Sequence, residues 1–113
     1  MKHDDPAFAE WRSLSAAFLT THPEVRTGNM MRSPALALHG KVFAFFTIHG
    51  GRTGLGVRLG RDTDFDALNM TDWQHLAPFR TKPPMKDWIV SGVADRARWP
   101  GLMDLAFDVA RRR

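Results

Sequence analysis

The sequence predicts an α+β fold, in which helices from both ends of the chain pack on one face of an antiparallel β-sheet. Apolar runs of strand length follow one another in the middle of the chain, separated by Gly40 and by Gly50-Gly51, as in a β-meander. Amphipathic stretches with helical spacing lie near both ends, and a further strand-like run precedes the second of them. With 113 residues, and apolar and charged fractions of 43 % and 25 %, the chain is expected to form a single domain over residues 1–113.

The first helix is predicted from about Pro6 to about Thr20. Asp4 and Asp5 can accept from the free amides of a first turn, and Pro6 lacks an amide that would stay unpaired there. The apolar residues then recur at helical spacing: Phe8, Trp11, Leu14, Phe18 and Leu19. His22-Pro23 is predicted to end the helix, and the stretch from Pro23 to Pro34 is irregular, with a turn predicted at Thr27-Gly-Asn.

The meander is predicted from Ala35 to Leu59. Its middle strand, Val42 to Ile48, is apolar at both alternating sets of positions, so neither face should meet water. The terminal helices would shelter one face, and loops or a second copy of the chain would shelter the other. Gly54 and Gly56 lie two apart on one strand face, which indicates close approach by a helix or a partner.

The second half of the chain is less regular. Thr63-Asp-Phe-Asp66 is typical of a capping box and predicts a short helix through Leu68, whereas Met70 to Leu76 shows no clear period. A last strand is predicted from about Asp87 to Val93. Arg98-Trp99-Pro100 then begins an amphipathic helix. The terminal arginines lie at its C-terminal end, where positive charges interact favourably with the helix dipole.

Composition excludes several classes of protein. The chain has no cysteine, which removes disulfides and thiolate chemistry, and no apolar run of about 18 residues that could span a membrane. We therefore expect a cytoplasmic protein with no membrane association. The net charge of +4 is compatible with nucleic acid as a partner but does not require it.

No motif for catalysis or metal binding is complete. Asp62-Thr-Asp-Phe-Asp66 resembles the start of a calcium loop, but Ala67 replaces its glycine and Trp73 replaces its bidentate carboxylate. The five histidines lack paired spacing, and the glycine-rich stretch runs from strand to strand, without a helix to hold a phosphate. We expect no catalytic residues, no cofactor and no metal.

One group of residues has the composition of a nucleic-acid surface. It combines basic side chains with the aromatic residues Phe79 and Trp88, and its cations are Arg52, Arg58, Arg61, Arg80, Lys82 and Lys86. Aspartates are interleaved with these cations, so the alternative interpretation is the solvated rim of a sheet. Composition alone favours that alternative.

Several segments resemble the TfoX amino-terminal domain and the related MmcQ/YjbR-like proteins. They are Met30-Met31, His39-Gly-Lys-Val-Phe-Ala-Phe46, Leu55-Gly-Val-Arg-Leu59, Pro84-Met-Lys-Asp-Trp-Ile-Val90 and Trp99-Pro-Gly-Leu-Met-Asp-Leu-Ala106. The likeness covers nearly the whole chain from Met30 onward. It implies a small α+β domain of the CyaY-like fold, and it carries no catalytic residues. TfoX-type proteins are associated with competence for DNA uptake, and YjbR-like proteins are described as candidate DNA-binding proteins.

These observations lead to two hypotheses for function. In the first, the chain is a non-enzymatic binding domain of the TfoX/YjbR type that binds DNA through the basic cluster. In the second, it is a protein-interaction or homodimerisation module that uses the sheet face left open by the helices and has no role with nucleic acid.

Overall fold

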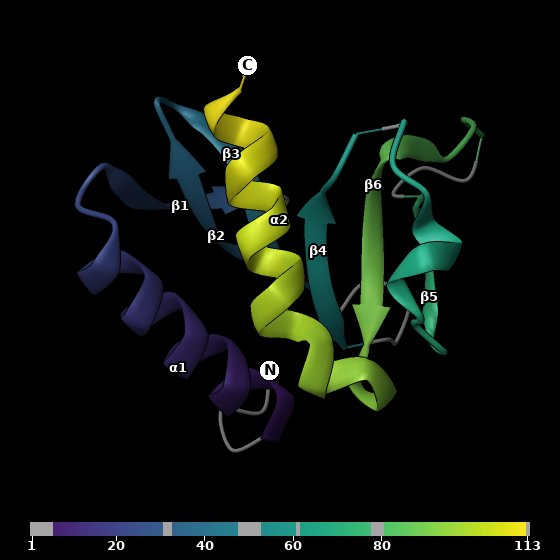
Figure 1. Cartoon of the computed structure of the whole chain (residues 1–113), viewed down its shortest axis with the longest axis horizontal. Coiled ribbons are helices and arrows are strands. Elements are labelled where there is room, and N and C mark those ends of the chain that lie inside the picture. Colours follow the sequence, from purple (N-terminus) through teal and green to yellow (C-terminus); the bar gives the residue numbers. More distant parts are fainter. Residues whose placement is uncertain (1–5, 31–32, 48–52, 61, 78–80, 113) are drawn as a thin grey trace.

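Six strands form one antiparallel sheet, and both long helices cover the same face of it (Figure 1). The computed structural model describes residues 6–30, 33–47, 53–60, 62–77 and 81–112. The strand order in the sheet is β1-β2-β3-β4-β6-β5. In chain order the elements are α1 (Pro6–Thr21), β1 (Val25–Met30), β2 (Ser33–Leu38), β3 (Lys41–Thr47), β4 (Gly54–Arg58), the 3-10 helix η2 (Phe65–Leu68), β5 (Trp73–Leu76), β6 (Met85–Gly92), the 3-10 helix η3 (Val93–Arg98) and α2 (Trp99–Arg111).

The predicted α+β architecture is confirmed, together with both terminal helices and the meander. The last strand is displaced from its predicted range by up to two residues, since β6 begins at Met85 and ends at Gly92. Val93 is 40 % exposed and already belongs to η3. The predicted hairpin turn at Gly50-Gly51 lies outside the described residues.

The predicted turn at Thr27-Gly-Asn is wrong, because these residues lie in a strand. Val25 to Met30 form the edge strand β1, which pairs with β2 from Val25–Leu38 through Met30–Ser33. Only Val25 is buried in β1, so the segment shows almost no apolar alternation, and Gly28 and Asn29 are poor strand formers. Pairing with β2 outweighs these local preferences. Pairing also determines the strand at the other edge of the sheet. There the stretch from Met70 to Leu76, which shows no clear period, contains the four-residue strand β5.

A β-bulge changes which side chains of β3 share a face. Ala37 pairs with Val42 but Leu36 pairs with Ala44, so β3 carries one extra residue against β2. Phe43, Ala44 and Phe46 therefore all belong to the core beneath the helices, while Val42 and Phe45 belong to the opposite face. Strict alternation along Val42 to Ile48 predicts Phe43 and Phe45 on one face, and this prediction is wrong because the bulge shifts the alternation by one residue.

The core beneath the helices is aromatic. Phe18 of α1 contacts Phe43 of β3 and Phe107 of α2, with ring centroids 5.8 and 5.1 Å apart. Trp99 is fully buried at the start of α2, and its indole Nε1 donates to the Ser91 hydroxyl on β6 at 3.2 Å. The buried polar groups at this corner are thus paired, and α2 is attached to the sheet at its first residue.

The face away from the helices has a smaller core of its own. Its members are at most 9 % exposed in the single chain: Ala35, Phe45, Leu76, Trp88 and Val90. Phe45 makes an edge-to-face contact with Trp88 at 5.5 Å. These five side chains are therefore buried within the single chain.

Gly56 confirms the expected close approach, and the approaching group is the ring of Phe45 rather than a helix. A Cβ added at Gly56 would lie 2.2 to 2.7 Å from three carbon atoms of that ring. Phe45 is fully buried, so the ring has little room to move.

Gly56→Ala is expected to lower the free energy of unfolding by about 1–3 kcal/mol, because the methyl group overpacks the Phe45–Trp88 contact. Gly28→Ala is the matched control, since a Cβ there meets nothing within 4 Å. Urea unfolding of both variants measures the difference. Equal stability of the two variants would contradict the close packing at Gly56.

Candidate nucleic-acid interface

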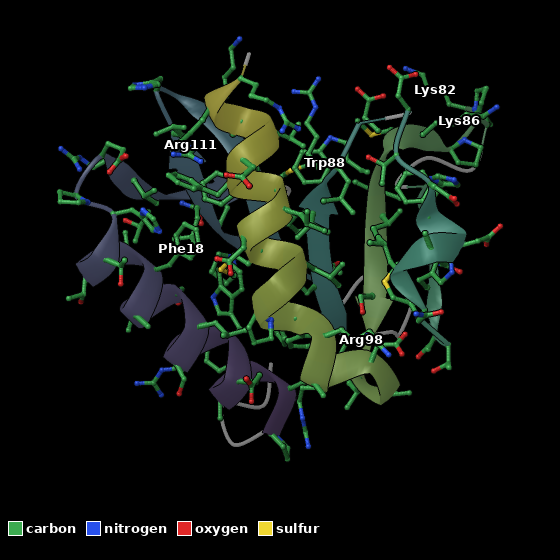
Figure 2. The ribbon with its side chains drawn as sticks, in the orientation of Figure 1. Phe18, Lys82, Lys86, Trp88, Arg98 and Arg111 are labelled. Carbon is green, nitrogen blue, oxygen red and sulfur yellow. The ribbon has the colours of Figure 1, made fainter. Side chains whose placement is uncertain are left out.

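Three of the six predicted cations lie in the described part of the chain: Arg58, Lys82 and Lys86. The other three, Arg52, Arg61 and Arg80, lie outside it, as does Phe79. Arg58 ends β4 and pairs with Trp88 on β6, and Lys86 lies two residues before Trp88 on the same strand. Lys82 and Lys86 lie at the same end of the molecule (Figure 2). The fold therefore brings all three described cations to one end of the sheet, and we call them the basic rim.

The charge of Arg58 is partly compensated. Its Nη2 lies 3.3 Å from Oδ2 of Asp87, and both side chains keep about a third of their surface exposed, 31 % and 29 %. The carbonyl of Asp87 also accepts from the amides of Leu59 and Gly60, at 2.9 and 3.1 Å, which fixes the end of β4 against β6. Water screens a pair at this exposure, so the contact positions Arg58 more than it stabilises the fold.

The two lysines differ from Arg58 in exposure. Lys82 and Lys86 are both exposed, and Lys86 makes no hydrogen bond or ion pair within the described ranges. An open hollow of about 340 Å³ lies beside Lys86, lined by Arg58, Met85, Asp87 and Trp88 as well. The site thus presents exposed lysine side chains next to a positioned guanidinium, an arrangement suited to anions such as phosphate.

Sequence reasoning missed three further cations at this end. Lys41 begins β3, which runs antiparallel to β4 and so starts beside its end. Arg111 and Arg112 lie at the C-terminal end of α2, which reaches the same end of the molecule (Figures 1 and 2). Arg111 forms an ion pair with Asp108, and its guanidinium carbon lies 5.0 Å from the ring centre of Phe107. The short link between the predicted last strand and the last helix was a usable signal, because a helix that follows a strand directly turns back across the sheet. α2 does so over β4 and β3.

Asp95 lies outside the basic rim and is a buried carboxylate, with 5 % of its surface exposed. Both its oxygens accept from the amide of Thr71 at 2.9 Å, and the Thr71 hydroxyl and the amide of Asp72 also donate to it. Burial alone raises its pKa, but these hydrogen bonds and the nearby charge of Arg98 outweigh burial and hold the pKa below its ordinary value. Since four donated hydrogen bonds occupy the carboxylate, Asp95 holds η3 against the start of β5 and is poorly placed to act as a base.

The acidic turn before η2 serves as a helix cap. Asp64 is the cap, its Oδ1 accepting from the amide of Ala67 at 3.3 Å, whereas the hydroxyl of Thr63 donates to the carbonyl of Leu59. The predicted helix is confirmed, but the capping residue is Asp64 rather than Thr63. Within the described ranges no three metal-ligating side chains come together.

A second hollow lies between α1 and α2 and has a volume of about 220 Å³. The ring of His22 lies against Phe18 and Phe107 there, with centroids 4.4 and 4.3 Å apart, and the remaining lining is mostly apolar. This hollow offers packing surface but no set of converging polar groups. No helix in the described part of the chain is both long and apolar enough to cross a membrane.

Comparison with models of protein families, with curated proteins and with solved structures finds no match to this chain. The resemblance to TfoX and YjbR-like proteins therefore rests on the sequence motifs alone.

Asp95→Asn is expected to lower the free energy of unfolding by about 1.5–3 kcal/mol at pH 7, because it removes a charged acceptor and turns an amide NH₂ toward backbone donors. The folded pKa of Asp95 is lowered, so its contribution is complete above the unfolded pKa of about 4 and is lost as pH falls through the folded pKa. The stability gap between wild type and variant should therefore narrow in acid.

Urea unfolding between pH 7 and pH 2.5 measures that gap. Asp104→Asn, which changes an exposed carboxylate on α2, is the control and should stay within about 0.5 kcal/mol of wild type. A gap for Asp95→Asn that is the same at all pH values would show that the lost stability does not come from the carboxylate charge.

Proposed function

We propose that this protein is a non-enzymatic nucleic-acid-binding domain that binds DNA through the basic rim. The observation that carries the proposal is the convergence of Arg58, Lys82 and Lys86 at one end of the sheet, from β4, β6 and the segment before β6. Exposed cations on a rigid sheet end can neutralise phosphates without any reorganisation of the backbone. The sequence resemblance to candidate DNA-binding proteins supports the same function.

The charge balance sets the expected strength of binding. Three phosphate contacts correspond to a slope of about −2.7 in a plot of log affinity against log salt concentration. Asp87 reduces the contribution of Arg58 because the two side chains form an ion pair. Binding through the described cations should thus be moderate, strongly dependent on salt and insensitive to base sequence.

A non-enzymatic role agrees with the polar groups of the described chain. The carboxylate of Asp95 already accepts hydrogen bonds from Thr71 and Asp72, and the carboxylate beside the basic rim, Asp87, is engaged in the ion pair with Arg58. The arrangement therefore supports binding rather than turnover.

The double variant Lys82→Glu with Lys86→Glu tests the proposal. Affinity for a DNA fragment at low salt should fall by about tenfold or more, because two attractive charges become repulsive. Fluorescence anisotropy over a series of salt concentrations measures both the affinity and its slope.

Arg12→Glu is the matched control, since Arg12 is an exposed cation on α1 and is not part of the basic rim. It should change affinity much less than the double variant does. Wild-type protein that binds no DNA at low salt would refute the proposal, and so would a double variant that binds as tightly as wild type.

A further inference from the structure

Within the part of the chain that the structure describes, the aromatic side chains of the sheet face beside the basic rim, Trp88 and Phe45, are not available to nucleic-acid bases. Trp88 is 6 % exposed and Phe45 is fully buried, and the two rings contact each other edge to face. Phe45 lies over Gly56, where even a single added carbon atom would clash with it. Proteins that bind single strands stack bases on exposed ring faces, and this sheet face presents none at Trp88 or Phe45.

A half-exposed aromatic group does exist, but it lies toward the other end of β6. Trp73 pairs with Ser91, five residues along β6 from Lys86, which corresponds to about 17 Å. Its ring packs against Phe65 and His75, at 5.4 Å in both cases. A base stacked on Trp73 would therefore lie far from the rim cations.

Exposed cations, by contrast, reach this end of the molecule from several elements. Lys41, Lys86 and Arg112 are exposed and come from β3, β6 and the residue after α2. The register places the start of β3 beyond Val57 and the start of β6 beyond Arg58, so both lie at the end where β4 finishes. The C-terminal end of α2 reaches this end too (Figure 1).

The size of the molecule is compatible with a duplex. The molecule measures 36 × 35 × 27 Å, so its longest dimension is comparable to one turn of B-DNA, about 34 Å. A duplex also carries about twice the charge density of a single strand along its axis, which favours a surface that binds by charge alone.

We infer that the partner of this surface is double-stranded DNA, bound through its phosphates without base stacking, and that the contact extends from Lys82 and Lys86 to Lys41 and Arg112. This inference rests on the proposed function and names the form of nucleic acid that the same site takes. The sheet end contributes cations from β3, β4 and β6, and α2 contributes the last of them.

The test compares an end-labelled duplex of about 20 base pairs, two helical turns, with a single strand of the same sequence. Anisotropy titrations at several salt concentrations should show the duplex bound about tenfold or more tightly than the single strand. Single-strand affinity equal to or above that of the duplex would overturn the inference and leave nucleic-acid binding intact. No binding of either form at low salt would refute the proposed function itself.

Three variants test the extent and the mode of contact. Arg112→Gln should reduce the salt slope for the duplex by about 1, whereas Arg12→Gln on α1 should leave it unchanged. An unchanged slope for Arg112→Gln would remove the end of α2 from the interface. Trp73→Leu, which removes the aromatic ring, should not alter affinity for either form, and a loss of single-strand binding in that variant would show that bases stack on Trp73, against the inference.

Discussion

The domain depends on one constraint, that β3 must be hidden from water on both of its faces. Phe43, Ala44 and Phe46 face the helices while Phe45 faces the other way, and all four are at most 2 % exposed. The bulge against β2 makes this division possible, because the extra residue places two consecutive side chains on the helix side. The two helices cover one face, and the Phe45–Trp88 contact over Gly56 closes the other.

This constraint also positions the basic rim. Since Phe45 crosses Gly56 to reach Trp88, β4 and β6 are held in a fixed register, and their ends carry Arg58 and Lys86. The contact that removes the aromatic rings from solvent thus places cations at the end of the same strands. Among the described residues the result is a group of cations beside two buried aromatic rings, and from this arrangement we propose contact with phosphates rather than with bases.

Much of the fold could be predicted from local sequence because the central elements carry strong periodic signals. Pro6 and Pro100 mark both long helices, and Gly40 marks the β2–β3 turn, where it has a positive φ of 81°. The edge strands could not be predicted, since β1 buries only Val25 and β5 only Leu76. Their existence depends on pairing with a neighbour, which local propensity does not contain. The bulge in β3 also depends on pairing with β2, so local sequence did not predict it.

The candidate site was predicted in part. Arg58, Lys82 and Lys86 were found because they are close in sequence or lie on adjacent strands. Lys41 and Arg112 were missed because their proximity follows from the direction of β3 and α2, which is a property of topology. Asp95 had no signal, since its hydrogen-bond donors come from Thr71 and Asp72, more than 20 residues earlier in the chain.

The weak strand character of β1 has a consequence for the molecule in a crowded solution. An unpaired strand edge can recruit a strand from another chain, and long, flat, apolar edges do so most readily. Gly28 and Asn29 make this edge a poor template, and Arg26 adds a charge to it. The residues that make β1 difficult to predict from sequence thus also make its free edge a poor site for pairing with another chain.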